Sequence, residues 1–162
     1  MRFVPRLFLA ALLLAAAGCG RPAVDLTKVL KVDVVQTGWW DLGIVNGQNK
    51  LVPQITIRLT NTSSEKLVML QLNAIFRQKT EEAEWSAQFI TVAKTEGLAP
   101  GATTDPIVIR SPLGYTGTDS RTTMMKSQYW IDARVDLFAK YGSAQLVKMG
   151  RYDIARDLLA KQ

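Results

Sequence analysis

The sequence contains no histidine and only one cysteine, Cys19. Without histidine the chain cannot build a Ser–His–Asp or Cys–His catalytic arrangement, and the common zinc sites lack their usual ligands. With one cysteine it cannot form an internal disulfide, so the fold must depend on packing and hydrogen bonds. Catalysis by carboxylates or by Ser–Lys remains formally open. We nevertheless expect a protein that is not an enzyme and that uses neither a cofactor nor a metal.

Charge is only mildly unbalanced. The chain has 20 Lys+Arg and 14 Asp+Glu, a formal net charge of +6, and the charges are scattered. No basic stretch with interleaved aromatic residues occurs, so we do not expect nucleic acid binding. A mild positive balance suits an anionic lipid or glycan surface, but it is also typical of an ordinary solvated surface.

The N-terminal twenty residues have the layout of an export signal. Arg2 and Arg6 are the only charges before an apolar run over residues 7–17, which is too short to span a bilayer. Residues 16–18 are small and directly precede Cys19. Such a layout also fits an ordinary secretory signal or a retained N-terminal helix.

These residues resemble the bacterial lipobox, whose cysteine becomes diacylated, although Ala16 stands where the pattern usually has leucine. The resemblance implies removal of residues 1–18 and acyl chains on Cys19. More than one chain would anchor the protein in a membrane, since each buried methylene contributes about 0.8 kcal/mol. Gly20 follows the cysteine, where aspartate is associated with inner-membrane retention. The expected location is therefore the outer membrane of a bacterial envelope, with the domain facing the periplasm.

The remaining chain is long enough for one domain with its own core. Residues 19–28 include Arg21-Pro22 and show no periodicity, which predicts a tether, and residues 29–162 form the predicted domain. Six segments alternate or are apolar in the manner of strands: 30–35, 51–60, 68–76, 85–89, 107–109 and 131–140. With a further turn and strand after residue 140, about seven strands predict an all-β, immunoglobulin-like sandwich.

Two strand-like segments and the tail carry specific expectations. One face of the second segment holds Leu51, Pro53, Ile55, Ile57 and Leu59, and one face of the last holds Ile131, Ala133, Val135, Leu137 and Ala139. Pro53 is expected near the start of its strand or at a sheet edge, because it cannot donate to the ladder. The final segment, "DIARDLLAKQ", spaces Ile154 and Leu158 at i and i+4, which predicts a short C-terminal helix.

The stretch "ITIRLTNTSSEKLVMLQLNAIFR", followed by "GLAPGATTDPIVI", resembles FxLYD-type and LEA14-like immunoglobulin-fold domains of exported and membrane-tethered proteins. In that pattern Asn61 occupies a turn between two strands, and residues 98–101 form a loop before a further strand. The resemblance covers residues 55–109, and the F-x-L-Y-D string itself is absent. It implies the fold class and a binding or spacing role.

The densest aromatic cluster is "TGWWDLG", which holds Trp39 and Trp40 between two glycines. The glycines predict a turn between strands. Because adjacent residues on a strand point to opposite faces, one tryptophan could lie in the core and the other at the surface. An exposed tryptophan would suit a glycan, a lipid headgroup or a partner protein. The alternative is that both cap the sandwich.

Residues 111–128 read as a long loop that is rich in glycine and threonine. Loops of this length are often functional, and four apolar side chains would suit a partner protein: Leu113, Tyr115, Met124 and Met125. The alternative is a loop that packs on its own sheet. "GYTGTDS" within it is a poor phosphate loop, since no lysine follows and no helix is expected there.

Two groups of charged residues are expected to have structural rather than functional roles. Glu81, Glu82 and Glu84 are read as a solvated hairpin tip rather than a cation site. Asp132, Arg134 and Asp136 share one face of a strand and should pair with charges on a neighbouring strand.

The sequence therefore predicts a lipid-anchored, non-catalytic module that binds an envelope protein. A small ligand, lipid or glycan bound through Trp39, Trp40 or the 111–128 loop is the alternative.

Overall fold

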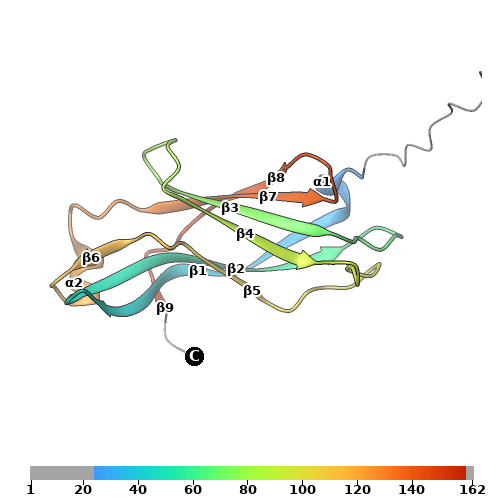
Figure 1. The fold of residues 1–162 in the computed structure, drawn as a ribbon. Coiled ribbons are helices and arrows are strands. Elements are labelled where there is room, and N and C mark those ends of the chain that lie inside the picture. Colours follow the sequence, from blue (N-terminus) through green and yellow to red (C-terminus); the bar gives the residue numbers. More distant parts are fainter. Residues whose placement is uncertain (1–23, 160–162) are drawn as a thin grey trace, which may run out of the picture.

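Two stacked sheets form the protein in a computed structural model that describes residues 24–159 (Figure 1). The predicted all-β sandwich is confirmed. Its elements in chain order are α1 Leu26–Val29, β1 Leu30–Val45, β2 Gln48–Asn61, β3 Leu70–Gln78, β4 Ser86–Ala93, β5 Ile107–Arg110, β6 Tyr115–Gly117, α2 Arg121–Lys126, β7 Ala133–Tyr141, β8 Val147–Asp153 and β9 Leu158–Leu159. Two of these nine strands, β6 and β9, lie in segments predicted as loop and helix.

The first sheet has the order β5-β2-β1-β9, with β6 also paired to β2, and the second has the order β4-β3-β7-β8. In Figure 1 they form the lower and upper layers. The long β1–β2 hairpin turns at Asn46 and Gly47, whose φ angles are 52° and 78°. Asn-Gly is the favoured pair for a turn with two positive φ angles, so this hairpin has a local cause.

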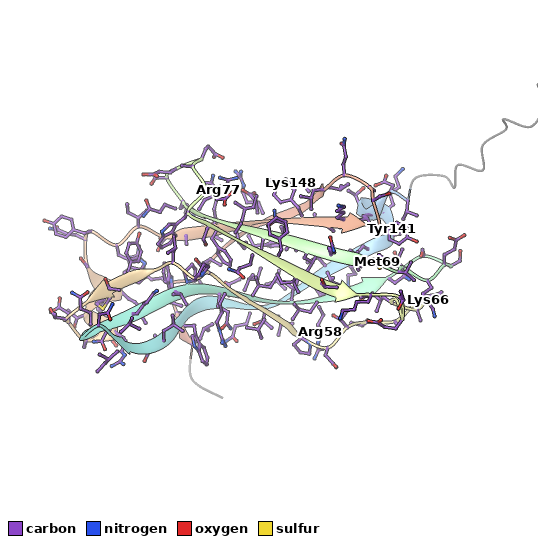
Figure 2. The ribbon with its side chains drawn as sticks, viewed as in Figure 1. Arg58, Lys66, Met69, Arg77, Tyr141 and Lys148 are labelled. Atoms are coloured by element: carbon purple, nitrogen blue, oxygen red, sulfur yellow. The ribbon has the colours of Figure 1, made fainter. Side chains whose placement is uncertain are left out.

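The core lies between the sheets and follows the predicted alternation. The fully buried side chains include Leu51, Ile55, Ile57 and Leu59 of β2, Leu70, Leu72, Ala74 and Phe76 of β3, and Ala133, Val135, Leu137 and Ala139 of β7. Figure 2 shows side chains filling the space between the two layers. The inward faces predicted for β2 and β7 are therefore confirmed, because a slip of one residue would turn these apolar side chains to the other face.

Pro53 departs from its expected place. It lies in the middle of β2, which is an interior strand, rather than at a strand start or a sheet edge. On one side of β2, the partner β6 pairs with residues up to Leu51 and the partner β5 pairs from Gln54 onward. Pro53 sits at the gap between these partners, where its carbonyl accepts from the Ser111 N–H at 3.0 Å. A residue without an N–H therefore costs no ladder hydrogen bond there.

The turn after β2 is organised by the buried side chain of Asn61. Its amide donates to the carbonyls of Glu65, at 2.7 Å, and Leu98, at 2.9 Å, and its oxygen accepts from the Ser63 N–H at 3.0 Å. The Asn61 backbone N–H also donates to the carbonyl of Ala102 at 3.0 Å. The predicted turn at Asn61 and the loop at residues 98–101 are therefore joined to each other in space.

The predicted C-terminal helix is wrong for the described residues. β8 runs to Asp153, and the chain then extends to β9, which pairs in parallel with Trp39 and Trp40 of β1. Ile154 is buried, and the Trp39 N–H donates to the carbonyl of Asp157 at 2.8 Å. An isolated helix of this length is marginal in water, so the free edge of β1 decides the conformation.

Two further segments differ in detail from simple alternation. The alternation of Trp85, Ala87 and Phe89 predicts a strand with these side chains on one face, yet Phe89 of β4 is 74% exposed while Ser86 is buried. Within the predicted tether, Asp25 caps α1 and Leu26 packs into the core. Of the helices seen in residues 24–159, none combines the length and apolar character that crossing a membrane requires.

Candidate functional site

The predicted lipidation site, Cys19, lies outside the described residues, as does the whole of residues 1–18. Within the described residues, two surface features have the chemistry of a binding site. One is a groove beside Trp40 on the outer face of the first sheet, and the other is a charged cluster around Asp136 on the outer face of the second.

Trp39 and Trp40 lie inside β1, not on a turn between strands. Trp39 faces the core and has no exposed surface, with its ring centroid 4.4 Å from that of Trp130 and 5.6 Å from that of Tyr115. Trp40 points to the opposite face and is half-buried. Of the two interpretations left open for this pair, the structure agrees with division between core and surface rather than with both residues capping the sandwich, since strand geometry separates adjacent side chains.

Trp40 borders a groove of about 320 Å³ on the outer face of the first sheet. The guanidinium of Arg110 lies over the Trp40 ring, 3.9 Å from its centroid, and its Nε donates to the side-chain oxygen of Gln54. Gln54 and Thr56 are buried although they face away from the core. The groove therefore combines an aromatic edge, a fixed cation and buried polar groups.

The rim of this groove is apolar. Val35 and Val108 are 53% and 48% exposed, and Leu159 of β9 closes one side. Leu159 lies directly over Gly38, where a Cβ would come within 2.6 Å of its Cδ2 atom. The sequence signal for this site was Trp40 alone. Gln54 and Arg110 lie at outward positions of their strands. Polar residues are expected at such positions, so neither residue indicated a site.

The 111–128 segment forms β6 and α2 against its own sheet, where two of its four proposed contact residues are buried and a third, Tyr115, is half-buried. Met124 and Met125 are 9% and 6% exposed, and the Tyr115 hydroxyl donates to the carbonyl of Ile131 at 3.1 Å. Burial raises the pKa of Tyr115 above its ordinary value. Leu113 alone remains available, at 46% exposed. The alternative of a segment that packs on its own sheet is therefore correct.

Two residues explain why the 111–128 segment is ordered against its sheet. A Cβ on Gly114 would lie 2.0 Å from the Leu51 carbonyl oxygen, so only glycine lets the chain approach β2 and form β6. Ser120 then caps α2, its hydroxyl accepting from the Thr123 N–H at 3.2 Å. The expectation that no helix begins here was wrong. The missed signal was Ser120 followed by the apolar pair Met124-Met125.

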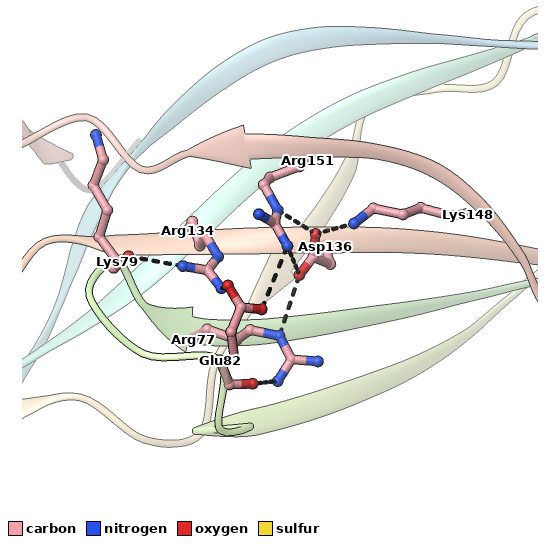
Figure 3. Close-up of polar contacts among 7 residues, drawn as sticks. All are labelled: Arg77, Lys79, Glu82, Arg134, Asp136, Lys148 and Arg151. Atoms are coloured by element: carbon pink, nitrogen blue, oxygen red, sulfur yellow. Dashed lines mark hydrogen bonds and ion pairs between the residues drawn. The ribbon is translucent and has the colours of Figure 1, made fainter.

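Asp136 is the centre of the charged cluster and is only 2% exposed (Figure 3). Its carboxylate meets Arg77 Nε at 3.1 Å, Lys148 Nζ at 2.7 Å and Arg151 Nε at 2.8 Å. Burial by itself would raise the pKa of Asp136, but these three hydrogen bonds outweigh it and hold the pKa well below its ordinary value. The predicted pairing of this strand's charges with its neighbours is confirmed for Asp136.

Glu82 completes the cluster from the β3–β4 loop. Its carboxylate lies 2.7 Å from Arg134 Nη2 and 3.6 Å from Arg151 Nη2. Arg134 is buried and also donates through Nη1 to the carbonyl of Lys79 at 2.7 Å. Glu82 is therefore more than part of a solvated hairpin tip. Within the described range, no group of three or more acidic or cysteine side chains is placed to hold a metal ion.

Comparison with known proteins finds similar solved structures but no family. No protein-family model matches the chain, and no curated protein matches it significantly. A solved structural genomics target designated SoR45 has 11% sequence identity and a TM-score of 0.42, covering 80% of this chain and 85% of that chain. A candidate ApaA protein from Bordetella pertussis has 18% identity and a TM-score of 0.42, covering 78% of this chain and 93% of that chain.

Proposed function

We propose that this chain is a lipid-anchored protein of a bacterial envelope, tethered through acyl chains on Cys19 and serving as a non-catalytic accessory module for another envelope protein. Support for the anchor comes from the sequence, in which the single cysteine follows an apolar run and small residues. Outer-membrane placement, with the domain facing the periplasm, rests on Gly20. The joined turn at Asn61 and loop at residues 98–101 are consistent with an FxLYD-type or LEA14-like domain.

The observation that carries the binding role is the groove beside Trp40. Trp39 is buried in the core, whereas Trp40 is half-buried at the surface with Arg110 stacked on its ring. Tryptophan and arginine are the residue types that most often dominate protein interfaces. The groove lies on the outside of one sheet, and the exposed Val35 and Val108 stand beside it, which favours the side chains of a partner protein over a small molecule.

A small ligand is the second candidate function. An aromatic ring beside the Arg110 guanidinium and the Gln54 amide is a polar and apolar combination that also suits a glycan or an anionic lipid headgroup. The two candidates use the same residues, so one experiment can separate them.

The anchor predicts a complete change of location for Cys19→Ser. The wild-type chain should fractionate with membranes and incorporate a clickable palmitate analogue, whereas the variant should take no label and leave the membrane fraction. The physical reason is that the acyl chains supply the membrane affinity. Thr27→Ser, an equally conservative change nearby, should behave like wild type. Unlabelled wild type, or a variant that stays on the membrane, would refute the anchor.

The binding role predicts a discrete contact at the groove. A photo-crosslinking amino acid placed at Val108 in cells should give one protein adduct, and Trp40→Ala should remove it. The same amino acid at the exposed Thr95 is the control and should give none. A Val108 adduct that survives Trp40→Ala would contradict the proposal. Absence of any protein adduct, with glycan or lipid binding that depends on Trp40, would favour the second candidate.

A further inference from the structure

The outer face of the second sheet carries more cations than its carboxylates can neutralise. Arg77, Lys148 and Arg151 all share the single carboxylate of Asp136. Arg134 lies directly opposite Arg77 in the β3–β7 ladder, an arrangement that like charges disfavour. The buried Asp136 cannot satisfy a fourth cation, so Arg134 requires a carboxylate from elsewhere.

That carboxylate comes from an exposed loop residue. Glu82 is 78% exposed at its side chain, yet it reaches Arg134, whose side chain is 6% exposed. Nε of Arg134 is buried and has no hydrogen-bond partner within residues 24–159. Figure 3 shows Glu82 between Arg134 and Arg151, with Arg77 donating to the Glu82 carbonyl. A solvated carboxylate thus fills a preformed guanidinium site without satisfying it completely.

Two phenylalanines flank a buried asparagine beside these cations. In the sheet register, Phe89 of β4, Asn73 of β3 and Phe138 of β7 lie side by side, and Lys148 of β8 follows. Phe89 is 74% exposed. Lys148 Nζ is 5.9 Å from the Phe138 ring centroid. Asn73 is 6% exposed, and its Oδ1 is buried without a partner in the part of the chain that the structure describes. A ligand here would meet cations and apolar side chains together.

We propose that this face docks an acidic segment of a partner protein, whose carboxylate takes the place that Glu82 holds in the free chain while an apolar side chain of the segment covers Phe89. Exchanging one carboxylate for another preserves the ion pair of Arg134, so the buried guanidinium always has a carboxylate partner. Complementary charge then selects an acidic partner over others. This inference depends neither on the lipid anchor nor on the Trp40 groove, and its failure would leave both standing.

The test uses the full chain purified in detergent and a fluorescent peptide that repeats Glu-Glu-Leu-Leu, so that each face of the extended peptide carries both glutamate and leucine. Wild type should bind this peptide with an affinity that falls as salt is added. Glu82→Gln should bind it about three- to tenfold more tightly, because the internal competitor is weakened and more molecules present an open site. Glutamine keeps a hydrogen-bond acceptor for Arg134, and a thermal unfolding curve checks that the variant remains folded.

Glu84→Gln is the matched control. Glu84 is exposed in the same loop, and no ion pair to it is seen in residues 24–159. Both variants change the net charge equally, so equal tightening by both would show a long-range charge effect and overturn the proposal. Equal binding of a peptide with glutamine in place of glutamate would also overturn it. So would tighter binding of polyphosphate or of anionic vesicles than of the acidic peptide.

Discussion

Replacing Trp39 with alanine should lower the free energy of unfolding by about 3–5 kcal/mol, the range found for large aromatic deletions in cores. Trp39 has no exposed surface and contacts an aromatic cluster with Trp85, Tyr115 and Trp130. Removing it leaves a cavity between the sheets, and the ring partners lose their packing. Thermal unfolding followed by circular dichroism should show a midpoint lowered by about 10 °C.

Two variants control this result. Trp40→Ala, in the adjacent position, should cost only about 1 kcal/mol, because that ring is half exposed on the opposite face. Trp39→Phe should restore most of the lost stability, since it refills much of the volume and removes a buried indole N–H that lacks a partner in the described residues. Equal losses for Trp39→Ala and Trp40→Ala would mean that the face assignment of β1 is wrong.

The second large effect is expected at the centre of the charged cluster. Asp136→Asn should destabilise the protein at neutral pH by about 2–4 kcal/mol, because Arg77, Lys148 and Arg151 lose their shared carboxylate. The cost stays below that of a fully buried pair, since Lys148 and Arg151 are each 46% exposed and can be hydrated. Urea denaturation of the two proteins at neutral pH gives the difference.

The pH dependence of this difference has a definite sign. The folded protein holds the pKa of Asp136 below its ordinary value, so the unfolded state binds a proton more readily. The stabilisation is therefore fully present above the unfolded pKa and declines as the pH falls below about 4. The advantage of wild type over Asp136→Asn should shrink across that window. A constant difference would mean that the carboxylate charge contributes nothing.

Asp153→Asn provides the comparison for a surface pair. Asp153 meets Lys79 at 2.7 Å, but both side chains are more than half exposed. Solvent screening leaves such pairs within about 1 kcal/mol, so this variant should unfold nearly as wild type does at every pH. A loss as large as that of Asp136→Asn would assign the effect to net charge rather than to burial.

Much of the sandwich was predictable because its cause is local. The period of two in β2 and β7 placed Ile57 and Val135 in the core, and both are fully buried. The Asn-Gly pair at residues 46–47 closes the longest hairpin, and its effect is equally local. Division of Trp39 and Trp40 between two faces follows from strand geometry alone.

Other features depend on partners distant in sequence. From the sequence, Met124 and Met125 are predicted to be exposed in a loop. In the structure they are buried, because Gly114 lets their segment approach β2. The pairing of Asp136 with neighbouring strands was predicted, but its burial depends on cations from β3 and β8 that cover it. The burial of such polar groups depends on what neighbouring strands carry at the same register. No pattern within one segment contains that information.

By itself, then, the sequence determined the class of fold and the inward faces of the principal strands, because each follows from periodicity or composition within a short window. The tertiary structure alone decided that the C-terminal segment pairs with β1, that Arg110 stacks on Trp40 and that Glu82 reaches Arg134. Each of these joins residues far apart in the chain. Their energies come from a sheet edge, a ring face and a buried guanidinium that exist only once the two sheets have formed.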